Sequence, residues 1–503
     1  MSSSNGRPRL SRNLVANLIR FSSIILISFF LSPYVVHKLG AAGYGIWTLI
    51  AGLTGYLGLL DFGVRQSINK FVAHHHAVGE HQDSSIIVTT GLKLFFVAGV
   101  FALFLTVLLA WLAPSIFNIP PELLEDSRVV ILLGGATVGV SLICGVFGGV
   151  VSGVQRFDVQ CGLDVSISLL RALATVYVLH NGWGLVGMAI AHLAVSALNL
   201  LFYIVACNRL YAELRVVLSH PLHPHARKLL GFASAFFAIH VLNAIAFHSD
   251  NIVIGVAMPI ESIAFFAIAA TLVKQSSGLT DALAHLMTPR ISALASQGQP
   301  VGDDILSAAR IATMLIVPVA LTFLIRGETF IFLWMGEEFA DLSGKVLRIL
   351  AIVLWIGATR AVIFNSLAGL GKHRMLIKGI ALEAFSNVAL SILLVGPYGV
   401  VGVALGTLIP NIFITLFYFP KKLYDAVGVR RRLVYQHALI LPSLVALPFA
   451  AAMYWVETRH PATNLWIFFA QLAGLLLLMP LAAWLYGFTK PEKAQLIALL
   501  KRQ

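Results

Sequence analysis

The chain has 503 residues, of which 58% are hydrophobic and only 11% are charged, and its mean hydropathy is +0.88. Because a soluble domain carries about 25% charged residues, this composition excludes a soluble globular protein and indicates a chain that lies largely within a membrane. The formal charge of +13 is then expected on a cytoplasmic face against anionic lipid, and not on a nucleic-acid-binding surface.

Apolar runs of membrane-crossing length follow one another along the whole chain. They are continuous and do not alternate with a period of two, so they predict helices and not a β-barrel. The sequence therefore predicts an all-α polytopic membrane protein with about fourteen transmembrane helices. The expected spans are residues 14–38, 44–71, 86–112, 129–153, 159–180, 184–208, 229–256, 262–288, 306–325, 345–369, 375–396, 399–419, 433–456 and 464–487. The first is too long for a secretory signal peptide and lacks a clear cleavage site.

The distribution of lysine and arginine predicts the orientation of these spans. With the N-terminus inside, the large majority of the basic residues fall on the cytoplasmic side, as the positive-inside rule requires. The opposite loops then hold Lys38, Arg326, Lys345 and Arg459. Both termini are therefore expected in the cytoplasm.

A segment of the chain occurs twice. Residues 152–189 and 367–404 each contain a helix end rich in small residues, a basic turn, a span, a tight glycine turn and a further span. Six expected spans separate the copies, so both enter the membrane in the same direction, and parallel repeats are typical of two-lobed transporters with a central cavity. We expect an N-lobe at 1–210, a cytoplasmic linker at 211–228, a C-lobe at 229–420, and a two-helix appendage with a basic tail at 421–503.

Polar and ionisable residues inside the spans recur at helical spacing, as Asp164, Ser168 and Arg171 do. A charge in a span costs at least ~2.5 kcal/mol on insertion scales, so these faces are expected to line a hydrated cavity. The basic and amide candidates for its wall are Arg20, Arg65, Arg171, Lys274, Arg360 and Asn243. The acidic candidates are Asp61, Asp250, Asp281 and Glu383.

Some of these positions have a second interpretation. Asp61 and Arg65 are one turn apart and could simply neutralise each other. Arg20 could extend to the cytoplasmic surface, and Asp164 could be interfacial. Arg171 and Lys274 lie roughly midway along their spans and are the strongest candidates for a functional cavity.

Histidines and cysteines give no defined metal site. The run His74 to His76, with His81 nearby, is expected in a solvated cytoplasmic loop. The three cysteines, Cys144, Cys161 and Cys207, have the spacing of neither a metal site nor a disulfide framework and are expected to be buried. We predict no resident metal and no catalytic residue.

Several motifs resemble those of the polysaccharide biosynthesis (Wzx-type) flippases, a family of the superfamily that also contains multidrug extrusion proteins and lipid II flippases. The motifs are LGAAGYGIW at 39–47, GYLGLLDFGV at 55–64, GVQRFD at 153–158 and GWGLVG at 182–187. The resemblance covers most of the first twelve spans. It implies two lobes that rock about a central, often cationic, cavity.

The resemblance also implies a function. Such proteins move an undecaprenyl-diphosphate-linked oligosaccharide, as for O-antigen, capsule or exopolysaccharide, from the cytoplasmic to the periplasmic leaflet of the bacterial inner membrane. The basic candidates, Arg171 and Lys274 first, would then bind the diphosphate or acidic sugars. The acidic candidates would couple transport to a proton or sodium gradient, with no other cofactor. Other polysaccharide assembly proteins are possible partners.

Two alternatives remain open at this stage. A drug or small-metabolite antiporter of the same superfamily usually has twelve spans, which the last two spans argue against. A membrane enzyme acting on lipid-linked sugars would need a catalytic loop. The outward loops offer only Glu122, Glu125, Asp126, Glu337 and Glu338, which form no clear acid–base pair.

Overall fold

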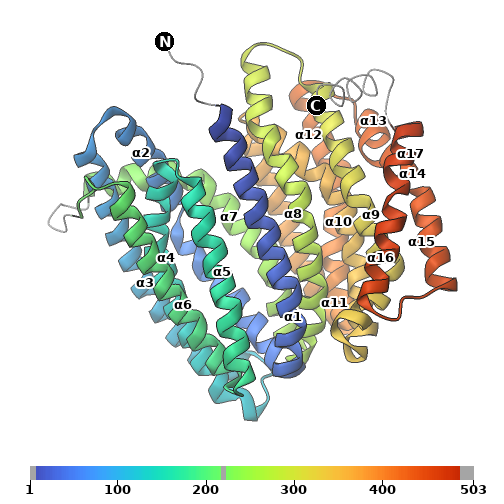
Figure 1. The fold of residues 1–503 in the computed structure, drawn as a ribbon, viewed down its shortest axis with the longest axis horizontal. Coiled ribbons are helices and arrows are strands. Elements are labelled where there is room, and N and C mark those ends of the chain that lie inside the picture. The colour runs from blue at the N-terminus through green and yellow to red at the C-terminus, as the bar shows by residue number, and fades with distance from the viewer. Residues whose placement is uncertain (1–6, 217–222, 488–503) are drawn as a thin grey trace. The chain divides into compact units, whose positions relative to one another are not determined.

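Every regular element in the part of the chain that the computed structural model describes, residues 7–216 and 223–487, is a helix (Figure 1). A helix satisfies its own backbone hydrogen bonds, which is what a lipid environment demands. Twelve of these helical segments are long and apolar enough to cross a membrane. The prediction of an all-α polytopic fold is therefore confirmed.

The described residues form two compact units, Met1–Ala264 and Phe265–Gln503, which we describe separately. Helix α8 begins at the end of the first unit and continues into the second. The first unit otherwise contains α1 (Arg7–Leu57), η1 (Gly58–Asp61), α2 (Val64–Val78), α3 (His81–Ile116), η2 (Pro121–Leu123), α4 (Leu124–Gly153), α5 (Phe157–His180), α6 (Gly184–Leu210) and α7 (His223–Ala257).

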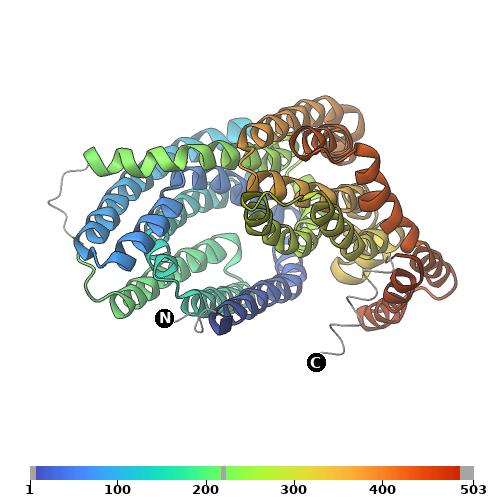
Figure 2. The ribbon, with the colours of Figure 1, turned by 90° about the horizontal axis from the view of Figure 1, so that it is seen from above.

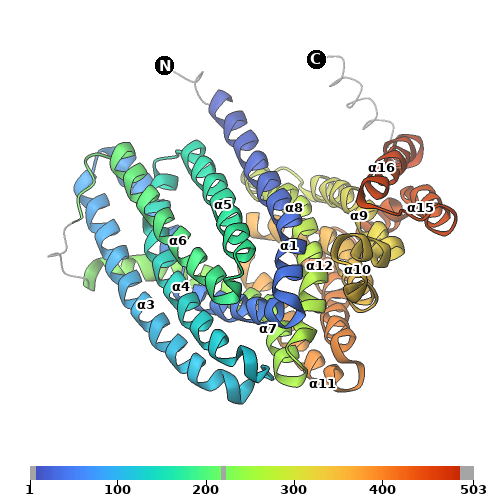
Figure 3. The same cartoon turned by 60° about the horizontal axis from the view of Figure 1, so that its bottom comes forward.

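In the first unit, α4 is the central helix. It packs against α2, α3 and α6, and Figures 1 and 3 show α3, α4 and α6 side by side. Helix α5 packs on α1 and α6, and α7 packs on α1, α2 and α3. Glycines of α4 permit the close approach of α2, because a Cβ at Gly149 would lie 3.1 Å from the carbonyl oxygen of Arg65. The first turn of α2 is therefore held against a flat face of α4.

The second unit contains most of α8 (Glu261–Ser296) and the helices that follow it. They are α9 (Gly302–Met335), α10 (Glu337–Gly369), α11 (His373–Phe413), η3 (Ile414–Tyr418), α12 (Phe419–Val427), α13 (Arg431–Val434), η4 (Tyr435–Ile440), α14 (Leu441–Val445), α15 (Leu447–Arg459), α16 (Leu465–Leu476), α17 (Leu478–Ala482) and η5 (Ala483–Gly487). Helix α10 packs along α9 and α11, and α15 and α16 both contact α9. Figure 2 shows these last helices, in red, at one edge of this unit.

The number of spans differs from the expected fourteen. Residues 22–61 and 373–427 each pass from one helix to the next without a loop, where two separate spans were expected. Each segment contains one non-helical glycine, Gly40 (φ 69°, ψ 174°) and Gly399 (φ 59°, ψ −139°). At each glycine one helix ends and the next begins across a kink, because these backbone angles are not helical. Both glycines lie where the sequence predicted a boundary, and the count of fourteen stays a prediction.

Three local expectations were wrong. The expected second span, 44–71, is broken near Phe62 and Gly63, which both have positive φ, so that Arg65 lies on the short helix α2. The run His74 to His76 lies in α2 and not in a loop. Arg326, expected in an outward loop, lies within α9 with its side chain fully buried.

The expected lobe boundaries stay predictions. Compactness groups α7 with the first unit, whereas the repeat places residues 229–256 in the second lobe. The two divisions rest on different properties, the density of contacts and the duplication of sequence.

Candidate functional site

A pocket of about 210 Å³, with a mostly apolar lining, lies in the first unit, where η1 and α2 meet α3 and α4. Asp61, Arg65 and Ser141 supply its polar side chains, and Phe95 closes part of its wall. The guanidinium of Arg65 extends along α4, because a Cβ built at Gly148 would lie 3.2 Å from Nη2. The absence of a side chain at Gly148 therefore makes room for this cation.

Asp61 holds the first turn of α2. Its Oδ1 accepts a hydrogen bond from the backbone N–H of Arg65 at 3.1 Å. A carboxylate at this position satisfies an N–H that has no partner within the helix and interacts favourably with the helix dipole. Asp61 and Arg65, both predicted from the sequence, therefore lie close together. The hydrogen bond between them joins the Asp61 carboxylate to the backbone of Arg65 and not to its guanidinium.

Asp164 and Tyr203 form a second polar contact in the same unit. The hydroxyl of Tyr203 on α6 donates to Oδ1 of Asp164 on α5 at 2.9 Å. Tyr203 also lies within electrostatic range of Arg65. Sequence periodicity did not single out Tyr203, because one aromatic residue with a polar tip in an apolar span is more often packing than function.

Arg171 lies on α5 with its side chain partly buried, and its Nε is buried without a hydrogen-bond partner. One turn further along α5, Oγ1 of Thr175 shares a hydrogen bond with Nε2 of His192 on α6 at 3.3 Å. The ring of His192 in turn meets that of Trp47 on α1, with 4.8 Å between centroids. Among the side chains that the structure describes, none forms an ion pair with Arg171.

Helix α7 carries Asn243, which is partly buried, and Asp250, which is only 5% exposed. Asp250 lies within electrostatic range of Tyr56 on α1. Tyr56 contacts the ring of His248, with 5.6 Å between centroids. The glycine at position 55 allows this approach, because a Cβ there would lie 2.6 Å from Nε2 of His248.

In the second unit, Arg360 and Glu383 form an ion pair between α10 and α11, in which Nη1 donates to both carboxylate oxygens. Nδ2 of Asn411 donates to Oε1 of Glu383 at 3.0 Å. One turn earlier on α11, Thr407 accepts a hydrogen bond from Nδ2 of Asn387 at 2.9 Å. The charge of Arg360 is thus compensated by Glu383.

Two further predicted residues lie on α8, both with exposed side chains. Asp281 is within electrostatic range of His285 and Arg360. Lys274 precedes it by two helical turns. The side chain of Arg20 lies outside the part of the chain whose side chains are described.

The sequence missed the polar partners of the predicted charges. Thr407 and Asn411 are four residues apart on a helix, so their common polar face was a usable signal. His192 and Tyr203 gave no such signal. The acids considered for an enzyme, Glu122, Glu125, Asp126, Glu337 and Glu338, are all exposed, and Glu125 pairs with Arg128 at 2.6 Å.

Comparisons with known proteins show which proteins this chain resembles. Residues 39–344 match the family model described as "Polysaccharide biosynthesis protein". A Shigella flexneri protein named as an O-antigen transporter is 18% identical over 395 residues, covering 78% of this chain and 93% of that protein. A Haloferax volcanii protein named as a low-salt glycan biosynthesis flippase is 20% identical over 380 residues, covering 74% of this chain and 75% of that protein.

Two solved structures have the same fold. An inward-facing multidrug resistance transporter of the MATE family superposes with a TM-score of 0.72 at 16% identity, covering 82% of this chain and 98% of that one. The lipid II flippase MurJ in an inward closed conformation superposes with a TM-score of 0.70 at 15% identity, covering 93% of this chain and 98% of that one.

Proposed function

Because the chain belongs to the polysaccharide biosynthesis protein family, we propose that it is a flippase for an undecaprenyl-diphosphate-linked oligosaccharide. The substrate passes from the cytoplasmic to the periplasmic leaflet of the bacterial inner membrane, and both termini of the flippase lie in the cytoplasm. Relatives named as an O-antigen transporter and a glycan biosynthesis flippase support this substrate class. The likeness to multidrug transporters concerns the fold alone.

The observation that carries the proposal is the uncompensated charge of Arg171. Its Nε is buried without a partner, and none of the described side chains forms an ion pair with it. A cation within a membrane span is costly unless an anion accompanies it. A diphosphate group supplies that anion and matches the planar donor fork of arginine.

Arg65 is a second contact for the head group. Its guanidinium lies on the glycine-lined face of α4, at a pocket of about 210 Å³. Pockets for drug-sized ligands measure about 300–1,000 Å³, so this pocket fits part of a head group and not an oligosaccharide. The sugars would therefore occupy space outside it.

Arg360 is the weakest of the basic candidates. The Glu383 carboxylate already accepts hydrogen bonds from its guanidinium. To bind a diphosphate, Arg360 would have to give up this ion pair. We therefore assign Arg360 and Glu383 a structural role within the second unit.

A proton or sodium gradient is proposed to drive transport. Asp250 is the first candidate for coupling, because its carboxylate is 5% exposed and lies on α7 near Tyr56. Binding and release of a cation change the cost of keeping such a carboxylate buried. Transport that continues after both gradients are collapsed would contradict this coupling.

The decisive experiment locates the lipid-linked repeat unit in a deletion strain. The proposal predicts that repeat units accumulate on the cytoplasmic leaflet and that surface polysaccharide is lost. Complementation with Arg171→Ala should fail at normal protein levels, whereas Arg128→Ala, which removes an exposed cation on α4, should restore export. Accumulation on the periplasmic leaflet would instead indicate a defect after flipping, and unchanged export by Arg171→Ala would remove that residue from the substrate site.

A further inference from the structure

The junction between α2 and α3 brings three metal-ligating side chains together. Helix α2 ends at Gly79, whose φ of 77° reverses the chain. The N–H of Glu80 donates to the carbonyl oxygen of His75 at 2.9 Å, and the N–H of Gly79 reaches that of His76 at 3.4 Å. This pattern is the Schellman motif. It holds Glu80 over the last turn of α2.

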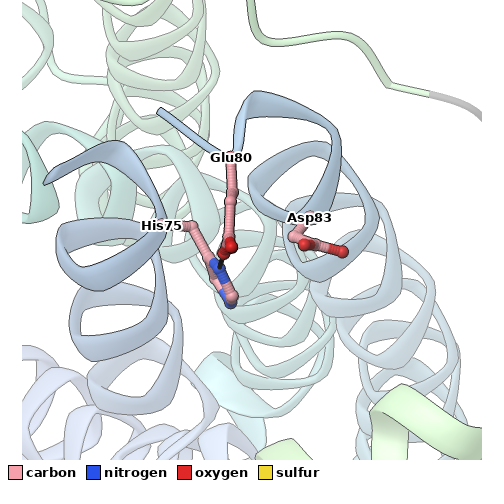
Figure 4. Close-up of side chains that lie close together, drawn as sticks. All are labelled: His75, Glu80 and Asp83. Carbon is pink, nitrogen blue, oxygen red and sulfur yellow. Dashed lines mark hydrogen bonds and ion pairs between the residues drawn. The ribbon is translucent and has the colours of Figure 1, made fainter. Parts of the chain in front are cut away.

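The side chains of the two helices meet at this turn. Nδ1 of His75 lies 2.7 Å from Oε2 of Glu80, and Asp83 lies on the first turn of α3 beside them (Figure 4). The ligand atoms of His75, Glu80 and Asp83 all lie within 4.8 Å of one another. In a tetrahedral zinc site with bonds of about 2.1 Å, ligand atoms are about 3.4 Å apart. To reach that spacing around an ion, the exposed Glu80 and Asp83 side chains have to rotate.

Burial distinguishes His75 from its neighbours in the histidine run. Its side chain is only 9% exposed, whereas His74 and His76 are exposed. His81 is occupied by a different contact, since its Nδ1 lies 2.9 Å from the hydroxyl of Tyr211. His75 is therefore the imidazole of this run whose ligand atom lies within 4.8 Å of both carboxylates.

We propose that His75, Glu80 and Asp83 bind one divalent transition-metal ion of the zinc class. Two carboxylates and a neutral imidazole compensate a charge of two, and imidazole favours Zn²⁺ over Mg²⁺ or Ca²⁺. Water completes the coordination on the exposed side. The ion joins α2 to α3, and so secures the helix whose first turn carries Arg65.

The test uses the full chain in detergent with an affinity tag that contains no histidine, titrated with Zn²⁺ by calorimetry. We expect about one Zn²⁺ per chain. Asp83→Asn and Glu80→Gln, both at exposed positions, should each weaken binding by at least about tenfold, as should His75→Gln. The matched controls His74→Gln and His76→Gln change exposed members of the same run and should leave the affinity unchanged.

Three results would overturn the proposal. They are the absence of saturable Zn²⁺ binding by the parent chain, unchanged affinity in Asp83→Asn, and equal weakening in the two control variants. The last result would mean that the histidine run chelates zinc without a defined geometry. Because Asp83→Asn and Glu80→Gln leave buried packing intact, a folding defect of His75→Gln does not decide the outcome. Export of polysaccharide plays no part in the measurement.

Discussion

The ion pair between Arg326 and Glu457 should be the most sensitive charged contact in the second unit. Arg326 on α9 is fully buried, and its Nε donates to Oε2 of Glu457 on α15 at 2.6 Å. The hydroxyl of Thr329 donates to the other carboxylate oxygen. The guanidinium also lies over the ring of Phe468 on α16, 4.5 Å from its centroid. The side chain of Arg326 on α9 thus contacts both α15 and α16.

Glu457→Gln keeps the size of the side chain and removes its charge. The guanidinium then stays buried beside a neutral amide, and removing one partner of a buried ion pair typically costs ~3–5 kcal/mol. The contact with Phe468 is retained and is worth about 2 kcal/mol when desolvated, so we expect a loss near the lower end of that range. The double variant Arg326→Met with Glu457→Met should recover most of the loss, because neither charge remains to be buried.

Equilibrium unfolding in mixed micelles, followed by tryptophan fluorescence, measures this difference. The control is Asp341→Asn, which breaks an ion pair with Lys345 whose side chains are 72% and 53% exposed. Exposed pairs contribute at most about 1 kcal/mol. The reasoning is refuted if Glu457→Gln loses no more stability than Asp341→Asn, or if the double variant is less stable than Glu457→Gln.

Three further predictions concern the fold and the candidate site. Gly369→Ala should destabilise the chain by ~1–3 kcal/mol in the same unfolding assay, because its Cβ would lie 2.5 Å from a backbone carbonyl oxygen of α8; Gly357→Ala on the same helix meets no atom within 4 Å and should be neutral or stabilising. Asp61→Ala should lower the free energy of unfolding by ~0.5–2 kcal/mol, because the first turn of α2 loses its side-chain cap. Asp61→Asn keeps a capping oxygen. Loss of export in Asp61→Asn at normal stability would show that the charge has a role beyond capping. Arg360→Ala should lower the free energy of unfolding by ~1.5–3 kcal/mol, the value of a charged hydrogen bond. Adding Glu383→Gln should restore stability and export. Export that stays lost in the stable double variant would show that Arg360 acts on the substrate.

The sequence predicted the helical architecture because membrane insertion leaves a strong signal in composition. Continuous apolar runs can only be helices there, and glycines such as Gly40 and Gly399 mark the bends. The same reasoning misplaced Arg326, because a window of hydropathy treats an arginine as the end of a span. Its neutralising partner, Glu457, comes 131 residues later, and no local pattern reveals that distance.

The sequence predicted which residues belong to the candidate site, but not which of them contact one another. Helical spacing identified Glu383, and Arg360 was recognised as a charge inside a span. A tertiary contact then joins the two across 23 residues. The histidine run was misread for a related reason. Its composition suggests a solvated loop, but α2 continues through it, and the glycine that ends the helix turns Glu80 back onto His75.

The pairings change what the balance of intramembrane charge means. The spans carry similar numbers of acids and bases, which from the sequence alone argues against a cationic site. The structure removes Arg360 and Glu383 from that balance, because they neutralise each other. The hydrogen bond of Asp61 is to a backbone N–H of α2, which does not cancel its charge. Arg171 keeps its charge without an ion pair among the described side chains, and Arg65 lines a pocket beside glycines. An anionic head group would therefore meet Arg171 and Arg65 as individual cations, in a unit that also holds Asp61, Asp164 and Asp250.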